Sequence, residues 1–151
     1  ATVAPGCGRP VAHRMITAME RTPLVAIVGS GFCGTVLAIR LLGEPTLRRL
    51  RILLIDRPGQ GVGGVAYDVT SPHLVLNVPS ARMSAFDERP DDFVEFLRSR
   101  DPAADPHGYA RRADYGEYLA ARLDQAARAA FTRSLGGVVV EPLAGRVRDL
   151  H

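Results

Sequence analysis

The amino-acid sequence predicts an α/β fold built on a parallel sheet, and two observations carry this prediction. Residues 24–56 run from an apolar stretch through a glycine-rich turn and a helical segment to a second apolar stretch that ends in Asp56. Residues 138–141 (VVVE) are rich in β-branched side chains, as is typical of parallel strands buried on both faces. Strands that alternate with helices in this order favour a Rossmann-like arrangement, in which helices and a parallel sheet pack in three layers.

The first strand, residues 24–28, leads into a turn with the pattern G-x-G-x-x-G, formed by residues 29–34. In such a turn Gly29 permits the sharp exit from the strand, Gly31 has no side chain to hold a pyrophosphate away, and Gly34 allows close packing of the following helix. The N-terminus of that helix offers unpaired N–H groups and positive dipole charge to phosphates. The turn therefore predicts a dinucleotide site, and the alternative is a plain glycine turn between ordinary elements.

The helix is expected over residues 35–42 and the second strand over residues 52–56, so that Asp56 closes the strand. An acid at this position, about 20 residues after the glycine motif, accepts hydrogen bonds from a ribose hydroxyl of an adenine dinucleotide. An acid also disfavours a 2′-phosphate. The first nucleotide bound is therefore not expected to be NADP.

Four glycines fall within residues 57–67, directly after Asp56. They predict either a flexible loop or backbone room for a ligand, and the position next to the ribose-binding acid favours the ligand. Residues 68–90 contain several proline and polar breaks. They are expected to be irregular, with one short strand over residues 74–78.

Helices and strands alternate again in the remainder of the chain. Asp91 is placed to cap a helix that runs to about residue 100, and a longer helix with an apolar stripe is expected over residues 113–131. The strand over residues 138–141 follows. Residues 145–150 alternate like the opening strand of a further element.

Composition places the chain among soluble globular proteins, with 46% apolar and 23% charged residues. Residues 1–22 are expected to be a flexible N-terminal tail without a secretory signal, and the ordered domain is expected to span residues 23–151. The net charge of +3 comes from arginines spread along the chain, so it indicates no nucleic-acid face. No run reaches the roughly 18 apolar residues of a membrane span.

The two cysteines, Cys7 and Cys33, are expected to be free thiols in a reducing cytoplasm, since a disulfide between them would tether the glycine turn. Cys33 lies near a helix N-terminus, where nucleophilic thiols occur, but a small residue that fills the turn is the favoured interpretation. His73 is expected to be structural, because the cysteines and histidines show no spacing typical of metal ligands.

Four motifs distinguish this chain among sequences with such a glycine turn. They are residues 29–35 (GSGFCGT), 64–67 (GVAY), 73–79 (HLVLNVP) with 83–86 (MSAF), and 112–119 (RADYGEYL). Together they closely resemble a bacterial FAD/NAD(P)-binding family that includes FAD-dependent urate hydroxylase and the nitrosuccinate-forming L-aspartate N-monooxygenase. The resemblance runs from about residue 23 to residue 150. Members typically have Ser in place of Cys33 and Pro in place of Arg111, and neither difference affects the phosphate turn.

The resemblance implies that FAD rather than NAD is the first ligand. It assigns the pyrophosphate to the glycine turn, the adenosine ribose to Asp56, and a further phosphate or ribose oxygen to Arg112, whose planar guanidinium bonds two oxygens at once. The alternative for Arg112 is a solvated residue at a helix start. The residues expected near the ribityl chain or the isoalloxazine ring are Tyr67, Asn77 and Met83. The full set of expected cofactor residues is Gly29, Ser30, Gly31, Phe32, Cys33, Gly34, Asp56, Arg57, Gly64, Tyr67, Asn77, Met83 and Arg112.

Enzymes of this kind need a second nucleotide site for NAD(P)H and a substrate lid, whereas this chain carries one glycine fingerprint. We therefore expect an incomplete FAD-binding domain, the N-terminal part of an NAD(P)H-dependent flavoprotein oxidoreductase. The resemblance implies a monooxygenase that hydroxylates a small polar substrate, and the segment by itself is expected to be inactive. Two alternatives stay open: a nucleotide-binding module without turnover, and an NAD-binding dehydrogenase domain.

Overall fold

The computed structural model describes residues 22–147. Apart from Thr22, the expected N-terminal tail lies outside this range, and so do residues 148–151. The further strand expected over residues 145–150 therefore falls partly outside the described residues. The part of it that is described, residues 145–147, has no regular structure.

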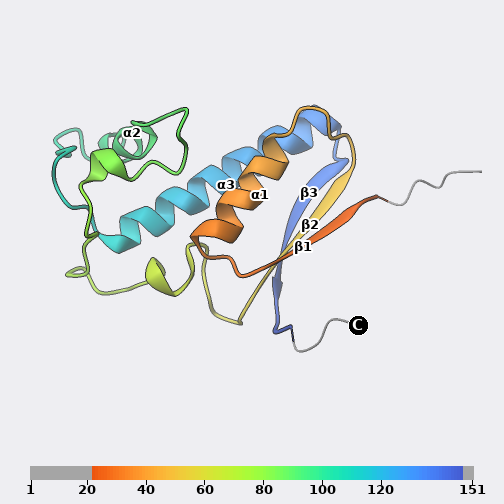
Figure 1. The fold of residues 1–151 in the computed structure, drawn as a ribbon, viewed down its shortest axis with the longest axis horizontal. Coiled ribbons are helices and arrows are strands. Elements are labelled where there is room, and N and C mark those ends of the chain that lie inside the picture. Colours follow the sequence, from red (N-terminus) through yellow and green to blue (C-terminus); the bar gives the residue numbers. More distant parts are fainter. Residues whose placement is uncertain (1–21, 148–151) are drawn as a thin grey trace, which may run out of the picture.

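Three parallel strands form one sheet in the order β1-β2-β3 (Figure 1). β1 (Leu24–Val28) pairs with β2 (Leu50–Asp56), and β2 pairs with β3 (Val138–Ala144). The structure confirms the three expected strands and lengthens the second and the third. Pro142 is tolerated inside β3 because this strand has a partner on one side only among the described strands.

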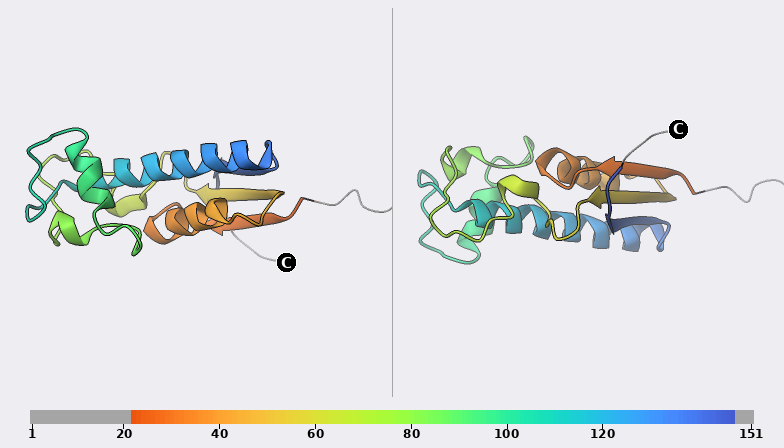
Figure 2. Two further views of the ribbon diagram at one scale, coloured as in Figure 1. Left: turned by 90° about the horizontal axis from the view of Figure 1, so that it is seen from above. Right: turned by 90° about the horizontal axis from the view of Figure 1, so that it is seen from below.

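Two long helices, α1 (Phe32–Gly43) and α3 (Arg112–Ser134), lie side by side on one face of the sheet (Figures 1 and 2). Alternate strand residues, among them Ile27, Ile52 and Leu54, are almost fully buried between the sheet and these helices. This is the expected α/β, Rossmann-like arrangement, with two of the three expected layers present among the described residues. Within residues 22–147 no helix is long and apolar enough to cross a lipid bilayer.

The other face of the sheet carries no helix among the described residues (Figure 1). We call this surface the open sheet face. Because strand side chains alternate between the two faces, it is formed by Leu24, Ala26, Val28, Arg51, Leu53, Ile55, Val139, Glu141 and Leu143. Apart from the ion pair between Arg51 and Glu141, at 3.0 Å, the open sheet face is apolar.

A long connection, residues 57–111, runs from the end of β2 to the start of α3. It contains one short helix, α2 (Asp92–Arg98), and two single 3₁₀ turns, η2 (Gly64–Ala66) and η3 (Ser80–Arg82). The expected helix near residues 91–100 is therefore present, although shorter. Asp91 is the N-cap residue, as expected, although its side chain makes no capping hydrogen bond.

The strand expected over residues 74–78 is absent. Val75 makes a single antiparallel bridge to Arg111, and the backbone N–H of Leu76 donates to the carbonyl of Ala110 at 2.8 Å. Pro72 and Pro79 bracket the segment and have no N–H to donate, so a ladder cannot extend beyond them. The rest of this stretch is irregular, as expected.

Aromatic side chains fill the core beneath this connection. Phe93 packs against Tyr115 and Tyr118, with ring centroids 5.0 and 5.1 Å away. The hydroxyl of Tyr118 donates to the buried carboxylate of Asp92 at 2.7 Å, and burial raises the pKa of Tyr118 to about 12. Arg122 pairs with the same carboxylate at 2.7 Å. These contacts hold α2 against α3 and so fix the first turns of α3 in place.

Candidate functional site

The candidate site lies at the edge of the sheet where all three strands end. In a parallel sheet the carboxyl ends of the strands meet at one edge, and ligands of such folds bind there. The N–H of Gly29, after β1, donates to the carbonyl of Ile55 at 2.7 Å, and the N–H of Gly145, after β3, donates to the carbonyl of Asp56 at 2.7 Å. These two bonds tie the three strand ends together beneath the site.

The three glycines of the turn differ in what surrounds them. Gly29 has φ +99°, a left-handed conformation that favours glycine. A Cβ on Gly31 would have no atom within 4 Å, so this residue borders open space. A Cβ on Gly34 would lie only 1.9 Å from the carbonyl oxygen of Gly29, so α1 packs directly on the turn. The geometry matches the sharp turn expected at Gly29 and the close packing expected at Gly34, and it leaves open space at Gly31, where a pyrophosphate is expected.

The N-terminus of α1 is free to bind an anion. Its N-cap residue, Gly31, provides no side chain, and the first turn contains no acid. The first helical hydrogen bond runs from the N–H of Thr35 to the carbonyl of Gly31 at 2.9 Å, which leaves the N–H groups of the three residues between them available. These residues are Phe32, Cys33 and Gly34. The side chain of Cys33 is an exposed free thiol.

Asp56 is bonded to the glycine turn itself. Its Oδ2 accepts a hydrogen bond from the backbone N–H of Ser30 at 2.6 Å and another from the Ser30 hydroxyl at 2.7 Å. Its Oδ1 accepts the N–H of Arg57 at 2.7 Å. The Ser30 hydroxyl, together with these two N–H groups, lowers the pKa of Asp56. The sequence did not reveal this link, because the position of an acid does not disclose which donors face it.

The glycine-rich loop after β2 packs on the turn. The N–H of Gly63 donates to the carbonyl of Ser30 at 2.9 Å, and Gly63 forms a bridge with Gly31. A Cβ on Gly64, which has φ +64°, would lie 3.0 Å from the Cα of Gly31. The glycines therefore allow a close approach between two loops, an explanation that differs from both the flexible loop and the ligand contact expected from the sequence.

α3 packs against the far side of this loop. A Cβ on Gly116 would lie 2.8 Å from the carbonyl oxygen of Tyr67. The ring of Tyr115 packs against Tyr67, with centroids 4.8 Å apart, and stacks with Phe32 at 6.3 Å. Burial raises the pKa of Tyr115. Of the expected cofactor residues, Phe32 and Tyr67 are thus brought together by Tyr115, which the sequence had placed only in the helix core.

Arg112, in the first turn of α3, is hydrogen-bonded to the long connection that precedes this helix. Its backbone N–H donates to the carbonyl of Leu74 at 2.8 Å, and its Nε donates to the carbonyl of Val75 at 3.1 Å. Its two terminal nitrogens make no hydrogen bond within residues 22–147. The neighbouring Arg111 instead pairs with Asp114 at 2.6 Å.

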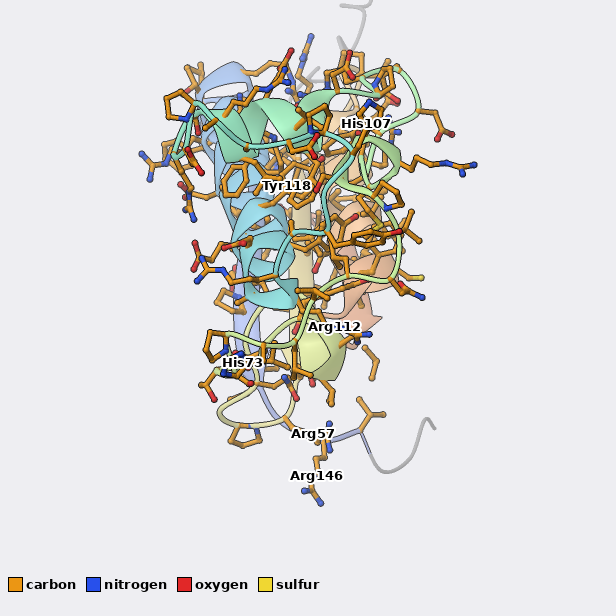
Figure 3. All side chains as sticks on the ribbon, turned by 90° about the vertical axis from the view of Figure 1, so that its left-hand side faces the viewer. Arg57, His73, His107, Arg112, Tyr118 and Arg146 are labelled. Carbon is orange, nitrogen blue, oxygen red and sulfur yellow. The ribbon has the colours of Figure 1, made fainter. Side chains whose placement is uncertain are left out.

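The remaining expected residues lie in different surroundings. Met83 packs against the hydrophobic core, and Asn77 is exposed. His73 is exposed as well (Figure 3). Among the described residues no group of three or more His, Cys, Asp or Glu side chains could hold a metal ion.

A cavity of about 440 Å³ opens beside Asp56 at the carboxyl edge. Its lining includes Arg146, which follows β3 and was not among the residues expected from the sequence. No local motif marks this arginine; only the return of β3 to the edge brings it there. A second cavity of about 440 Å³ lies between α2 and the start of α3 and contains none of the glycine-turn residues. A smaller cavity, of about 160 Å³, also adjoins the turn, and Ser30 and Asp56 are among its lining residues.

Comparison with known proteins agrees with this geometry. The model of a family described as FAD–NAD(P)-binding matches residues 26–151. The match covers the glycine turn, Asp56, the long connection and Arg146. No curated protein matches the chain.

Proposed function

The chain belongs to the FAD–NAD(P)-binding family, and on this premise we propose that the carboxyl edge of its sheet binds FAD. The observation that carries the proposal is the pairing of an open Gly31 with an uncapped α1 N-terminus, which leaves both space and N–H donors for a pyrophosphate. The choice of FAD over NAD is supported by the resemblance of the motifs at residues 64–67, 73–86 and 112–119.

Each part of the dinucleotide has a proposed set of partners. The pyrophosphate lies at the turn, against the N–H groups of Phe32, Cys33 and Gly34. The adenosine ribose bonds to Asp56, whose Oδ1 accepts only one hydrogen bond in the structure and so has capacity left.

Other groups are proposed for the flavin half of the molecule. Arg112 offers its free terminal nitrogens to a phosphate or ribose oxygen. Tyr67 and the loop at Gly64 lie against the turn and are proposed to face the ribityl chain. Asn77 and Met83 are proposed to lie farther along, toward the isoalloxazine ring.

The activity we propose is that of a flavoprotein oxidoreductase that uses NAD(P)H, specifically a cytoplasmic monooxygenase acting on a small polar substrate. FAD would supply the redox chemistry, and the residues of this chain bind and orient it.

Substitution of Gly31 tests the proposal sharply. Gly31 has φ −65° and ψ −175°, which a β-branched residue adopts readily, and its Cβ meets no atom. Gly31→Val should therefore fold normally while its methyl groups occupy the pyrophosphate path, and FAD affinity should fall by more than about tenfold. Calorimetric titration of the intact protein with FAD measures the effect, and thermal unfolding checks the fold.

Gly43→Val is the matched control, because Gly43 also borders open space but lies at the opposite end of α1. Equal FAD affinity in the wild type and both variants would contradict the assignment. Binding of NAD in place of FAD, with the same sensitivity to Gly31→Val, would instead support the dehydrogenase alternative.

A further inference from the structure

The helix α3 ends in an unusual residue. Leu135 caps the helix with φ +52° and ψ +42°, and it is the only residue other than glycine with a positive φ in the described part of the chain. Glycine or asparagine normally takes this left-handed conformation, because a larger side chain strains it. The Leu135 side chain is also 94% exposed. Neither backbone conformation nor burial therefore explains a leucine at this position.

The conformation of Leu135 is fixed by its neighbours. The N–H of Gly136 donates to the carbonyl of Phe131 at 2.8 Å, which closes the end of the helix. The carbonyl of Gly137 accepts the N–H of Leu50 at 2.9 Å, which joins the turn to the sheet. A strained residue persists where the surrounding structure determines its backbone in this way, and such residues gather at functional sites. The turn thus holds the leucine side chain outward in solvent.

A second apolar side chain and two arginines surround Leu135. Phe131, one turn earlier on α3, is 58% exposed. Arg48 and Arg49 belong to the loop that leads into β2, and both are exposed. A Cβ on Gly137 would overlap the carbonyl oxygen of Arg48, so this loop touches the turn after α3 (Figure 1). We call the surface formed by Phe131, Leu135, Arg48 and Arg49 the α3 tip.

The arginines of the α3 tip form no ion pair within residues 22–147. The side chain of Arg48 donates only to the carbonyl of Pro45, at 3.0 Å, and that of Arg49 makes no hydrogen bond in this range. The acid of the same loop, Glu44, accepts hydrogen bonds from the N–H and the hydroxyl of Thr46 instead. The α3 tip therefore joins an exposed apolar anchor to two positive charges that no carboxylate pairs.

We propose that the α3 tip docks the protein on an anionic lipid surface. Leu135 and Phe131 enter the boundary between headgroups and acyl chains, and the two arginines meet lipid phosphates. A side chain that is almost fully exposed projects from the surface, and a projecting apolar group suits insertion into lipid better than contact with a flat protein surface.

This docking would leave the nucleotide site accessible. The α3 tip lies beside Leu50 and Val138, the first residues of β2 and β3, and thus at the amino ends of the strands. The site proposed for FAD lies at the carboxyl ends, which form the opposite edge of a parallel sheet. The inference goes beyond the proposed function and does not depend on it.

The test is co-sedimentation of the intact protein with vesicles of phosphatidylcholine alone or of equal parts phosphatidylcholine and phosphatidylglycerol. The wild type should bind the mixed vesicles and not the neutral ones. Leu135→Gly should bind the mixed vesicles about tenfold more weakly, because an apolar anchor is lost. Glycine also suits the left-handed backbone, so thermal stability should be unchanged or higher. A leucine with a structural role alone would not give weaker binding at undiminished stability.

The charge is tested with the double variant Arg48→Gln, Arg49→Gln, which should bind the mixed vesicles about ten- to thirtyfold more weakly. The matched control is Arg82→Gln, Arg98→Gln, which removes the same charge from exposed arginines that also lack ion pairs in the described range. Arg98 belongs to α2, which packs near the start of α3, and the 23 residues of α3 span about 35 Å between its start and the tip (Figure 1). This control should bind like the wild type.

Leu74→Gly is the control for the leucine, because it makes the same substitution at a residue that is 46% exposed in the long connection. The chain contains no tryptophan, so Leu135→Trp adds a single fluorescent reporter, whose emission should shift to shorter wavelength on the mixed vesicles. An unshifted emission from bound protein would overturn the inference.

Three other results would also overturn it: unchanged binding of Leu135→Gly, equal losses in the two double variants, or a wild type that binds neither kind of vesicle. The last result would leave an acidic protein pocket as the partner that the α3 tip fits.

Discussion

At the scale of single residues, the site shows that the same residue type can be required for opposite reasons. Gly31 borders empty space, whereas Gly34 has no room for even one methyl group. The spacing of the glycine motif predicted the close packing at Gly34, and it predicts a ligand in the open space beside Gly31. The sequence could not predict the bond between Ser30 and Asp56 or the position of Arg146, since each depends on the tertiary approach of distant segments.

The Asp56 carboxylate should make stability depend on pH in the acid range. Its pKa is lowered in the folded protein, chiefly by the Ser30 hydroxyl. A lowered folded pKa contributes stability that is present above the ordinary value of about 4 and is lost as the pH falls through the folded value. Ser30→Ala removes the largest cause, so acid unfolding, followed by circular dichroism, should begin at a higher pH than in the wild type.

Ser99→Ala is the control for this experiment, because the Ser99 hydroxyl donates to the carbonyl of Phe96 and to no carboxylate. Asp56→Asn should flatten the pH dependence in the same range. If Ser30→Ala and the wild type unfolded at the same acid pH, the Ser30 hydroxyl would not be the group that lowers the pKa of Asp56.

At the scale of elements, the sequence predicted the helices and strands that a periodic pattern or a motif defines. It did not predict the structure of segments that depends on pairing with a distant part of the chain. The strands β1, β2 and β3 and the helices α1 and α3 were all expected from their patterns. Residues 74–78 have the composition of a strand, yet they make one bridge to Arg111. The glycines of residues 57–67 indicated that another group packs closely against this loop. Composition alone does not tell whether that group is a ligand or another loop.

The packing of α1 on the turn after β1 should be intolerant of any side chain. In Gly34→Ala the new Cβ would overlap the carbonyl oxygen of Gly29, so α1 or the turn must shift, at a cost of about 1–3 kcal/mol in the free energy of unfolding. Gly43→Ala, at the other end of the same helix, meets no atom and should leave stability unchanged or raise it by about 0.4–1 kcal/mol. Urea unfolding of both variants measures the difference. Equal free energies of unfolding would mean that the turn accommodates the added methyl group of Gly34→Ala without loss of stability.

At the scale of the whole molecule, α1 and α3 cover one face of the sheet, and no helix within residues 22–147 covers the open sheet face. Parallel sheets are found with both faces covered, because their strands are apolar on both sides. Leu24 and Val28 of β1 are 56% and 63% exposed on this face. β1 is also an edge strand among the described strands, with unpaired N–H and C=O groups along one side. Both features predict contact with another protein surface.

A polypeptide limited to these 151 residues should therefore associate with itself as its concentration rises. Leu24→Lys places a charge on the open sheet face, away from the cavity at the carboxyl edge, and should shift the sedimentation profile toward the monomer. Leu37→Lys makes the same change at a residue that is 49% exposed on α1, and it should leave the association unchanged because that helix faces away from the open sheet face. Analytical ultracentrifugation across a range of concentrations separates the cases. A wild-type polypeptide that stays monomeric, or equal effects of the two substitutions, would show that the open sheet face does not drive association.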